Sequence, residues 1–565
     1  MCSFVITVKL KVRNMEDLIA ALKAAGFTGD IDTTPASLDL YSHDASLFEI
    51  RPEVVVAPKN NEDVQKLVRT VASLRAEHPG LSVTARSAGT DMSGGAINDS
   101  VIVDFNKYFT HIEAVTADEA QVQPGVFYRD FEVETLKQNA LLPPYPASRD
   151  LCTVGGMVNN NAGGEKSLQY GKTEEFVREL RVVFADGNEY TVRPLNKDEL
   201  DAKMAQDDYE GRLYKQLYEL IEANYDQIKA AKPNVSKNST GYNLWYVWDR
   251  TTGIFDLTRL IVGAQGTLGF TIDIKFRLVP APQHSGTLVI FLRDITNLGS
   301  LINKVVQKRP ATFEGFDNYT LMLSFKLFFS FHKLIGWKDT IKLAFQLIPN
   351  ALMLLRGIPK MVLLVEFNGA TPEEVSQKVH AMREELAEFK QDSLFEEDDN
   401  EVKQRKFWIM RRSSFQLLRS KVKDKHTAPY IDDLVVNPEY LPEFLPELRK
   451  IIKKYKLLAT IAGHMGDGNF HIIPLMKLEE KEEREKLQPS MKEVNELVLK
   501  YKGSLSGEHN DGLVRGPWLE QMYGADMLAL FKQTKAIFDP ENIFNPHKKS
   551  DASWDYSFNH VRDHF

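Results

Sequence analysis

Two short segments near the end of the sequence carry side chains that can do chemistry. They read Ala462-Gly-His-Met-Gly-Asp-Gly-Asn-Phe-His471 and Ser506-Gly-Glu-His-Asn-Asp-Gly512. Imidazole and carboxylate groups together suit a borderline divalent ion such as Zn²⁺, Mn²⁺ or Fe²⁺, and three protein ligands leave positions open for catalysis. The alternative is a pair of surface histidines in a glycine loop and a solvated Glu-His pair. The spacing favours a catalytic metal site, whose ligands we expect to be His464, His471 and Glu508, with His509 beside them.

Three glycine-rich segments form a second group. Residues 83–95 read Val-Thr-Ala-Arg-Ser-Ala-Gly-Thr-Asp-Met-Ser-Gly-Gly, residues 150–164 read Asp-Leu-Cys-Thr-Val-Gly-Gly-Met-Val-Asn-Asn-Asn-Ala-Gly-Gly, and residues 263–269 read Gly-Ala-Gln-Gly-Thr-Leu-Gly. Backbone N–H groups in such loops can form a concave nest for a diphosphate without a lysine. No segment is the G-x-G-x-x-G fingerprint or a phosphate loop with its Gly-Lys-Ser/Thr ending. One such loop is more often a turn, but three indicate a cofactor site.

The order of these motifs resembles a known family. Pro52-Glu-Val-Val-Val-Ala-Pro58, the three glycine loops, the paired histidines and Glu508-His509 are similar to the vanillyl-alcohol-oxidase or PCMH-type flavoproteins. Within these, the sequence most resembles the branch of FAD-linked D-lactate dehydrogenases and glycolate oxidase subunits. Phe538-Asp-Pro-Glu-Asn-Ile-Phe-Asn-Pro546 is similar to the closing motif of that branch. The resemblance runs from about residue 40 to residue 549.

The resemblance implies an α+β fold. It consists of a two-part PCMH-type FAD-binding domain, an α+β substrate cap domain and a C-terminal helical segment. We expect an N-terminal extension over 1–50, the FAD-binding domain over 51–280, the cap over 281–440, and a segment with the metal and catalytic motifs over 441–565.

The resemblance also implies that FAD is bound without a covalent link, because the first loop has no histidine or cysteine where some relatives carry a tether. The residues expected to contact it are Arg86, Ser87, Ala88, Gly89, Thr90, Asp91, Ser93, Gly94, Thr153, Gly155, Gly156, Asn159, Gly163, Gly266 and Thr267.

The expected reaction is oxidation of a small D-2-hydroxy acid, D-lactate first, to its 2-oxo acid. A cation would lower the pKa of the substrate hydroxyl, and His509 would act as base, since imidazole titrates near neutral pH. Arg411 matches the family arginine that holds the substrate carboxylate, with Arg412 as the fallback. Ile473 stands where glutarate-type members carry a polar residue, which favours a monocarboxylate over 2-hydroxyglutarate; glycolate is also possible. A flavin oxidase that uses O₂ and a flavin-binding scaffold without activity are compatible with the same motifs.

Composition narrows the class of protein further. The net charge of −8 argues against binding of nucleic acid, and no basic arm is present. The two cysteines, Cys2 and Cys152, cannot hold an iron–sulfur cluster, so electrons must leave the flavin to a separate acceptor, which we expect to be a quinone or a partner protein. Few cysteines and an N-terminus that does not read as a secretory signal suggest a cytoplasmic protein, located at the inner face of the membrane if it binds lipid.

The stretch 320–363 departs from this acidic character. It interleaves Phe, Trp and Leu with six basic residues against one acid, Asp339, but has no apolar run long enough to span a membrane. This composition is typical of an in-plane element in peripheral membrane contact. The stretch could instead form helices that bury their apolar faces in the cap or in a homodimer interface, or a surface for a partner protein. The basic residues are Lys326, Lys333, Lys338, Lys342, Arg356 and Lys360.

Hydrophobic periodicity predicts the elements that position these motifs. We expect a helix near 15–25, a strand over 53–57, and an amphipathic helix over 61–76 with Asn61 as its N-cap. Further strands are expected over 81–85 and 101–104 around the first glycine loop, and over 114–122. A hairpin with an Asp186-Gly187 turn should join strands over 180–185 and 189–192, and residues 195–250 should be helical.

Overall fold

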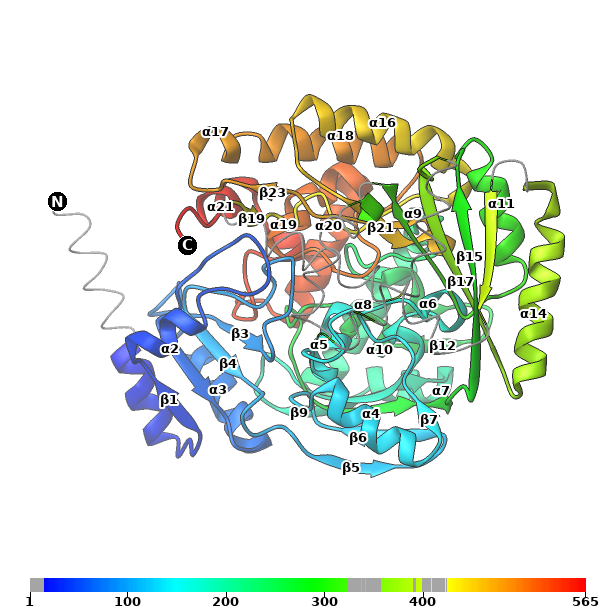
Figure 1. Cartoon of the computed structure of the whole chain (residues 1–565). Helices are drawn as coiled ribbons and strands as arrows, with labels where there is room; N and C mark the ends of the chain where they lie inside the picture. The colour runs from blue at the N-terminus through cyan, green and yellow to red at the C-terminus, as the bar shows by residue number, and fades with distance from the viewer. Residues whose placement is uncertain are drawn as a thin grey trace.

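The computed structural model describes residues 15–318, 320–322, 337, 341, 357–389, 393–398, 408, 422 and 424–565. Within these residues, three larger sheets and three small ones combine with helices in the mixed α+β fold expected from the sequence (Figure 1). Most of the stretch 320–363 and both Arg411 and Arg412 lie outside the described residues. No helix that the structure describes has the length and apolarity needed to cross a membrane.

The first sheet carries the first glycine loop. Its strand order is β1-β2-β4-β3, with β2, β4 and β3 parallel, so the loop that follows β3 emerges at one edge of the sheet. Helix α3 packs on this sheet through Val64, Leu67, Val68 and Val71, which recur at helical spacing. The strands are β1 (Asp30–Asp32), β2 (Val54–Ala57), β3 (Val83–Arg86) and β4 (Val101–Asp104), and the helices here are α2 (Pro35–Leu40) and α3 (Asn61–Leu74).

Two details of this region differ from the sequence prediction. The N-cap of α3 is Asn60, whose side chain accepts a hydrogen bond from the Asp63 N–H, and not Asn61. Strand β3, expected over 81–85, begins two residues later and ends one residue later than expected. Asn60 and Asn61 both have cap chemistry, so the sequence alone does not choose between them. The helix near 15–25 is confirmed over residues 15–24.

The second sheet is antiparallel, with the order β5-β6-β13-β8-β9. Its β8–β9 hairpin turns at Asp186-Gly187, where Gly187 has a positive φ of 72°, as the sequence predicted. The bounds are β5 (Ile112–Val115), β6 (Glu119–Val122), β8 (Val177–Val183), β9 (Glu189–Val192) and β13 (Phe270–Arg277), with the short pairs β7 (Ala140–Leu141), β10 (Pro194–Leu195), β11 (Trp248–Asp249), β12 (Ile254–Asp256) and β14 (Val279–Pro280).

Helices pack around the second sheet and form its hydrophobic core with it. Three of them, α7, α8 and α9, confirm the helical character predicted for 195–250 as far as Ala231, whereas the rest of that stretch contains loop, a short turn of 3-10 helix and strand β11. The helices are α4 (Tyr128–Lys137), α5 (Val154–Asn160), α6 (Ser167–Tyr170), α7 (Lys197–Met204), α8 (Tyr209–Ala223), α9 (Tyr225–Ala231) and α10 (Thr258–Ile261).

The third sheet carries the histidines and has the order β18-β15-β17-β16-β21-β22-β20. Its strands are β15 (His284–Leu292), β16 (Thr312–Asp317), β17 (Met361–Gly369), β18 (Ser393–Asp398), β20 (Leu434–Val435), β21 (Ile461–His464) and β22 (Asn469–Ile472), and a separate pair is β19 (His426–Thr427) with β23 (Leu475–Met476). Around it lie α11 (Leu298–Val306), α14 (Pro372–Glu385), α16 (Leu441–Lys454), α17 (Lys481–Arg484) and α18 (Leu487–Lys500).

The C-terminal part of the chain returns to the first two sheets. Helix α20 (Leu519–Phe538) packs into the core of the second sheet through Phe531 and Phe538, and Phe544 enters the core of the first. Short helices α19 (Gly512–Arg515) and α21 (Trp554–Asn559) flank it. The segment that carries Glu508 and His509 contacts Asp433 beside β20 on one side and the glycine segment 263–269 on the other.

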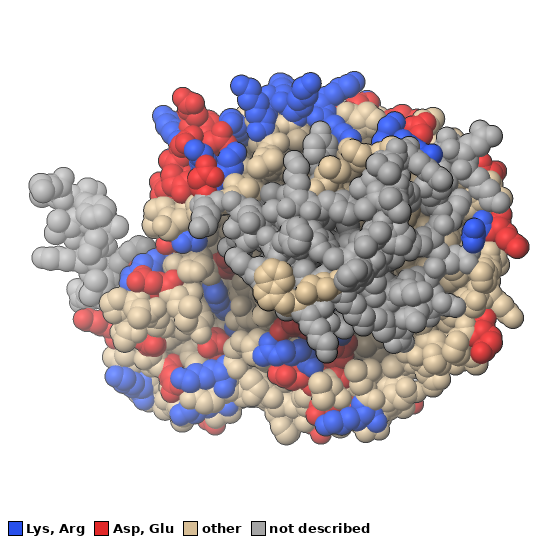
Figure 2. All heavy atoms as spheres, in the orientation of Figure 1, with Lys and Arg blue, Asp and Glu red and all other residues tan. Residues whose placement is uncertain are grey.

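Charge is unevenly distributed over this acidic chain. Figure 2 shows Lys and Arg side chains gathered at the top of the view, over the C-terminal end of α16. The basic residues there are Arg449, Lys450, Lys453, Lys454 and Lys456.

Candidate active site

A β-hairpin brings His464 and His471 to one face of the third sheet. Strands β21 and β22 are antiparallel, and Ala462 pairs with His471. Because side chains alternate along a strand, His464 shares the face of Ala462 and therefore of His471. The turn requires Gly468, which has φ of 63°, and a Cβ there would lie 1.8 Å from the Val436 carbonyl oxygen. The two imidazole centroids are 5.2 Å apart.

Buried carboxylates hold the Nδ1 atoms of all three histidines. Glu314 is the cross-strand partner of His464 and binds its Nδ1. Asp432 lies between the other two, with Oδ1 3.2 Å from His471 Nδ1 and Oδ2 3.1 Å from His509 Nδ1. With Nδ1 engaged, the Nε2 atoms remain as ligand atoms, which is the arrangement of carboxylate–histidine–metal sites.

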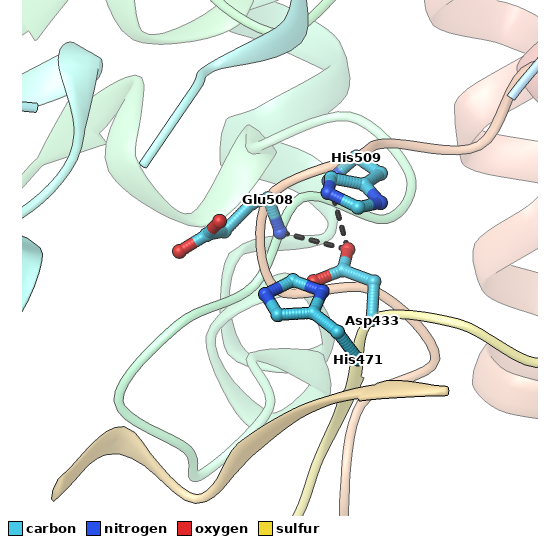
Figure 3. Close-up of side chains that lie close together, drawn as sticks. All are labelled: Asp433, His471, Glu508 and His509. Atoms are coloured by element: carbon cyan, nitrogen blue, oxygen red, sulfur yellow. Dashed lines mark hydrogen bonds between the residues drawn. The ribbon is translucent and has the colours of Figure 1, made fainter. Parts of the chain in front are cut away.

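Asp433 fixes the backbone of the second motif. Its Oδ2 accepts hydrogen bonds from the N–H groups of Glu508 (2.9 Å) and His509 (2.8 Å) (Figure 3). It also accepts a hydrogen bond from the Ser506 hydroxyl. Its Oδ1 accepts a hydrogen bond from Asn469 Nδ2. Burial opposes ionisation of Asp433, yet nearby His509 and Arg515 hold its pKa below the usual range. Asp433 therefore sets where Glu508 and His509 point.

The carboxylate of Glu508 meets two cationic groups. Lys237 Nζ lies 2.6 Å and His464 Nε2 lies 3.2 Å from the same oxygen, Oε1. Burial alone would raise the pKa of Glu508, but His464 and Lys237 hold it well below the usual value. Likewise, burial lowers the pKa of His464, but Glu314 and Glu508 outweigh it and raise the pKa to about 9.

His509 is also a stronger base than free imidazole. Burial lowers its pKa, but the carboxylates of Asp433 and Asp432 together raise it to about 9. Its ring stacks on His471 at a centroid distance of 5.1 Å. With these carboxylates alone the ring is protonated at neutral pH, whereas a second cation beside it would favour the neutral, proton-accepting form.

The donor set fits a divalent cation. Ligand atoms of Asp433, His471, Glu508 and His509 all lie within 4.8 Å of one another (Figure 3). Of the three expected ligands, His464 is outside this group, although its Nε2 lies 3.2 Å from Glu508 Oε1, and Asp433 in the group already accepts four hydrogen bonds. Buried carboxylates around the histidines outnumber the permanent cations, and either protonated His464 and His509 or a metal ion would offset that excess. The carboxylates are Glu314, Asp432, Asp433, Asp467 and Glu508, and the cations Lys172, Lys237 and Arg515.

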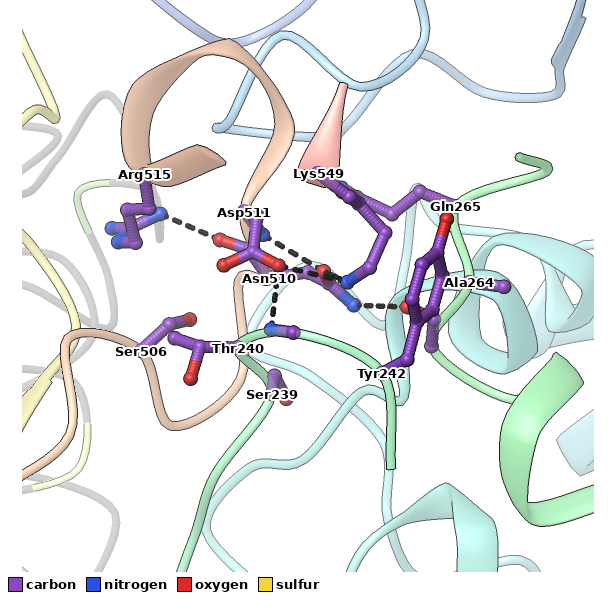
Figure 4. A network of polar contacts seen from close by, with 12 residues as sticks. Ser239, Thr240, Tyr242, Ala264, Gln265, Ser506, Asn510, Asp511, Arg515 and Lys549 are labelled. Carbon is purple, nitrogen blue, oxygen red and sulfur yellow. Dashed lines mark hydrogen bonds and ion pairs between the residues drawn. The ribbon is translucent and has the colours of Figure 1, made fainter. Parts of the chain in front are cut away.

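A second buried network joins the Glu508–His509 loop to the flavin side (Figure 4). Arg515, which is 1% exposed, donates hydrogen bonds to the carbonyl oxygens of Leu505, Asn510 and Asp432. Lys549 binds Asp511 and the Asn510 side chain, and Asn510 in turn donates to the Gly263 carbonyl. These contacts fix the loop against the third glycine segment.

One cavity of about 790 Å³ connects the histidines to the glycine loops. This volume lies toward the upper end of small-molecule sites. His464, His471, Glu508 and His509 line one part of it, together with Ile473. The expected flavin residues in its wall are Arg86, Ser87, Gly89, Thr90, Asp91, Thr153, Gly155, Gly156, Asn159, Gly163 and Gly266.

Side-chain contacts bring the three glycine segments together. Asp91 accepts hydrogen bonds from the Gly95 N–H and from Asn160 Nδ2, which links the first loop to the second. Gln265 of the third donates to the Ser93 hydroxyl and accepts from the Gly512 N–H. The three loops therefore form one wall of the cavity.

Four expected flavin residues do not line this cavity: Ala88, Ser93, Gly94 and Thr267. Ser93 and Thr267 have internal partners, since Ser93 binds Asp91, and Thr267 binds Tyr242 and the Ala264 carbonyl. Ser93 and Thr267 therefore stabilise the glycine loops through contacts outside the cavity. Arg411 and its fallback, Arg412, lie outside the described residues, so their role in carboxylate binding stays a prediction.

Several site residues were missed by sequence reasoning. Glu314 and Lys237 come from segments distant from the histidine motifs, and nothing local marks them. Asp432 and Asp433 lie directly before β20 and outside every motif that the sequence analysis used. A buried Asp-Asp pair directly before a strand was the available signal.

Family models match two parts of the chain. Residues 52–193 match an FAD binding domain, and residues 281–549 match the C-terminal domain of FAD linked oxidases. The first match contains two of the glycine loops, and the second contains the histidine sheet and the Glu508–His509 loop.

Curated relatives are similar along almost the whole chain. D-2-hydroxyglutarate dehydrogenase of Pseudomonas putida is 26% identical over 95% of this chain and 52% of the relative. The chain thus spans about half the length of the first relatives it matches. D-2-hydroxyglutarate dehydrogenase of Stutzerimonas stutzeri is 27% identical over 94% of this chain and 98% of the relative. Glycolate oxidase subunit GlcD of Bacillus subtilis is 26% identical over 92% of this chain and 93% of the relative.

Solved structures share the fold. The 4-ethylphenol oxidase from Gulosibacter chungangensis superposes with a TM-score of 0.66 at 12% identity, covering 96% of this chain and 98% of that one. An alkyldihydroxyacetonephosphate synthase superposes with a TM-score of 0.64 at 16% identity, covering 94% and 85%. Taken with the two family models and the curated relatives, these matches show that the chain belongs to the FAD-linked oxidases with a PCMH-type FAD-binding domain.

Proposed function

We propose that this protein is an FAD-dependent dehydrogenase that oxidises a small D-2-hydroxy acid to the 2-oxo acid. The observation that carries the proposal is the single cavity that joins the glycine-loop wall to His464, His471, Glu508 and His509. A flavin in the loops and a hydroxy acid at the histidines would then share one enclosed space. The curated relatives, named for oxidation of 2-hydroxy acids, support the same class of reaction.

The chain's own residues would divide the work. The bound flavin would accept the two electrons and the hydrogen on Cα, and the metal ion would polarise the substrate hydroxyl. His464, His471 and Glu508 would hold that ion, and the Nε2 of His509 would take the hydroxyl proton. Asp432 would keep two of the imidazoles in the correct orientation, as carboxylates do behind metal-binding histidines.

D-lactate is our first choice of substrate. Ile473 and Ala462 line the cavity near the histidines, which favours a short side chain over a second carboxylate. D-2-hydroxyglutarate is the second candidate, because several relatives carry that name. An anaerobic panel of D- and L-lactate, D- and L-2-hydroxyglutarate and glycolate, with bleaching of the flavin as readout, tests the proposal. A flavin that none of them reduces would contradict it.

We further propose that FAD is held without a covalent link and that a quinone or a partner protein takes up the electrons. Acid precipitation should leave the yellow colour in the supernatant; colour in the pellet would contradict the first claim.

The basic composition of 320–363 and the basic surface over α16 both favour contact with anionic lipid. Binding to anionic liposomes should weaken with salt, and equal binding to neutral liposomes would contradict it.

A further inference from the structure

Lys237 is a buried cation at the candidate metal site that the reaction scheme does not use. It is 2% exposed, and its Nζ lies 2.6 Å from Glu508 Oε1 and 3.0 Å from Asp467 Oδ2. A lysine this deeply buried is stable only when carboxylates accompany it. Its two partners are a proposed metal ligand and a carboxylate on the turn between the paired histidines.

The surroundings hold the Glu508 carboxylate in one orientation. Oε1 receives Lys237, whereas no hydrogen-bond donor from the described part of the chain reaches Oε2. Lys172 donates to the Gly507 carbonyl at 3.1 Å and fixes the backbone before Glu508.

A carboxylate can bind a cation through one oxygen or through both. Lys237 occupies one lone pair of Oε1, which disfavours binding of a metal ion through both oxygens at once. Three protein ligands with single donor atoms leave coordination positions open, and a catalytic site requires such positions. Two-oxygen binding by Glu508 would occupy one of them.

We propose that Lys237 is a positioning residue that restricts Glu508 to metal binding through one oxygen and so keeps a coordination position free for the substrate. This inference rests on the proposed metal site. It predicts opposite effects on metal binding and on turnover when Lys237 is removed, whereas a purely structural lysine would affect both in the same direction.

The sign of the effect on metal binding follows from charge. Lys237 repels a divalent ion that is bound to the same carboxylate. Across a few ångströms in a buried site, this repulsion weakens metal binding more than the ordering of the Glu508 side chain by Lys237 strengthens it. In Lys237→Met, binding of Zn²⁺ should therefore tighten by roughly tenfold or more. Flavin reduction should slow by roughly tenfold or more, because the substrate is held less well. Lys237→Arg keeps the charge and should restore both values toward wild type.

The experiment uses metal-depleted protein with FAD bound, titrated with Zn²⁺ calorimetrically, followed by anaerobic flavin reduction with the hydroxy acid that wild type oxidises. Lys166→Met is the matched control, because Lys166 is also buried and pairs with Glu366 at 2.6 Å outside the cluster. Equal or weaker Zn²⁺ binding by Lys237→Met, or flavin reduction at the wild-type rate, would overturn the inference. Wild-type protein that binds no divalent ion would instead overturn the proposed metal site.

Asp467→Asn tests the same idea if Lys237→Met does not fold. Loss of the Asp467 charge leaves the lysine with Glu508 as its sole charged partner among the described residues, so Zn²⁺ binding should weaken. Unchanged Zn²⁺ binding in Asp467→Asn would contradict the role of Lys237.

Discussion

At the residue scale, the site depends on which atoms of each histidine are already occupied. Glu314 and Asp432 contact the Nδ1 atoms of His464, His471 and His509, which leaves the Nε2 atom of each ring for a metal ion or a proton. Substitution of a metal ligand should therefore affect metal content, whereas substitution of the base should affect only the rate of flavin reduction. Variants of His471 and His509 separate these two roles.

His471→Ala should lose the metal and turnover but keep FAD and the fold. The imidazole lines the cavity and contacts Asp432, whereas the glycine loops are held by other contacts. Metal content by elemental analysis and the flavin absorbance of the purified protein check both parts. His426→Ala is the control, since His426 is half-buried, pairs with Glu479 and does not line the cavity. An unfolded His471→Ala protein would show that the site is structural.

His509→Asn should retain the metal but slow flavin reduction by roughly 10²–10⁴-fold, the usual contribution of a positioned acid–base group. The backbone N–H of residue 509 still reaches Asp433, so the loop should keep its position. Single-turnover reduction under anaerobic conditions measures the effect. Reduction at the wild-type rate would remove His509 from the mechanism.

The sequence located the histidines and Glu508 because rare residue types stand close together among glycines. It could not locate their carboxylate partners, because the chain has 78 Asp and Glu residues and strand pairing decides which of them are buried nearby. Glu314 meets His464 across strands that are 150 residues apart. Lys237 is inconspicuous for the same reason among 70 Lys and Arg residues.

At the scale of elements, the β21–β22 turn positions the histidines. Gly468→Ala would place a Cβ 1.8 Å from the Val436 carbonyl oxygen in addition to the cost of a positive φ. Gly524→Ala is the matched control, because Gly524 also has a positive φ, 80°, but no atom within 4 Å of the added Cβ. Gly468→Ala should lower the unfolding temperature more than Gly524→Ala does and should also slow flavin reduction. Equal shifts in the two variants would contradict the importance of this close approach.

The glycine loops give a second pair of variants. A Cβ at Gly156 meets only the Ser87 and Thr153 hydroxyls at 3.5 Å, so the protein itself accommodates it. Gly156→Val should keep the fold but weaken FAD retention, because the side chain extends toward the cavity that the glycine lines. Gly155→Ala would instead collide with Pro124 at 2.4 Å and should lower stability. Full FAD occupancy in Gly156→Val would place the cofactor elsewhere.

At this scale the sequence predicted the strands around the first glycine loop, the β8–β9 hairpin and the helices between residues 197 and 231, because their periodicity is local. It did not predict the order of strands in the third sheet. There β16 lies between β17 and β21, which are nearly a hundred residues apart in sequence. Such an order depends on long-range packing, which a single sequence does not show.

At the scale of the whole molecule, the C-terminal part of the chain packs against the first two sheets beside the cavity. Phe531 and Phe538 of α20 and the following Phe544 insert into the two N-terminal cores, and Asn545 donates to the carbonyl oxygens of Gly95 and Gln265. The family resemblance predicted both the cofactor side and the histidine side. That they share one cavity required the folded chain, because residues from both ends of the sequence form its walls.

The most direct test of this account is anaerobic stopped-flow reduction of the flavin by D-lactate and by D-2-hydroxyglutarate, with metal-depleted and Zn²⁺- or Mn²⁺-reconstituted protein. The account predicts rapid bleaching of the flavin by a D-2-hydroxy acid, loss of that reaction on metal depletion with FAD still bound, and recovery when the metal is restored. A metal-free protein that reduces its flavin at the full rate would contradict it.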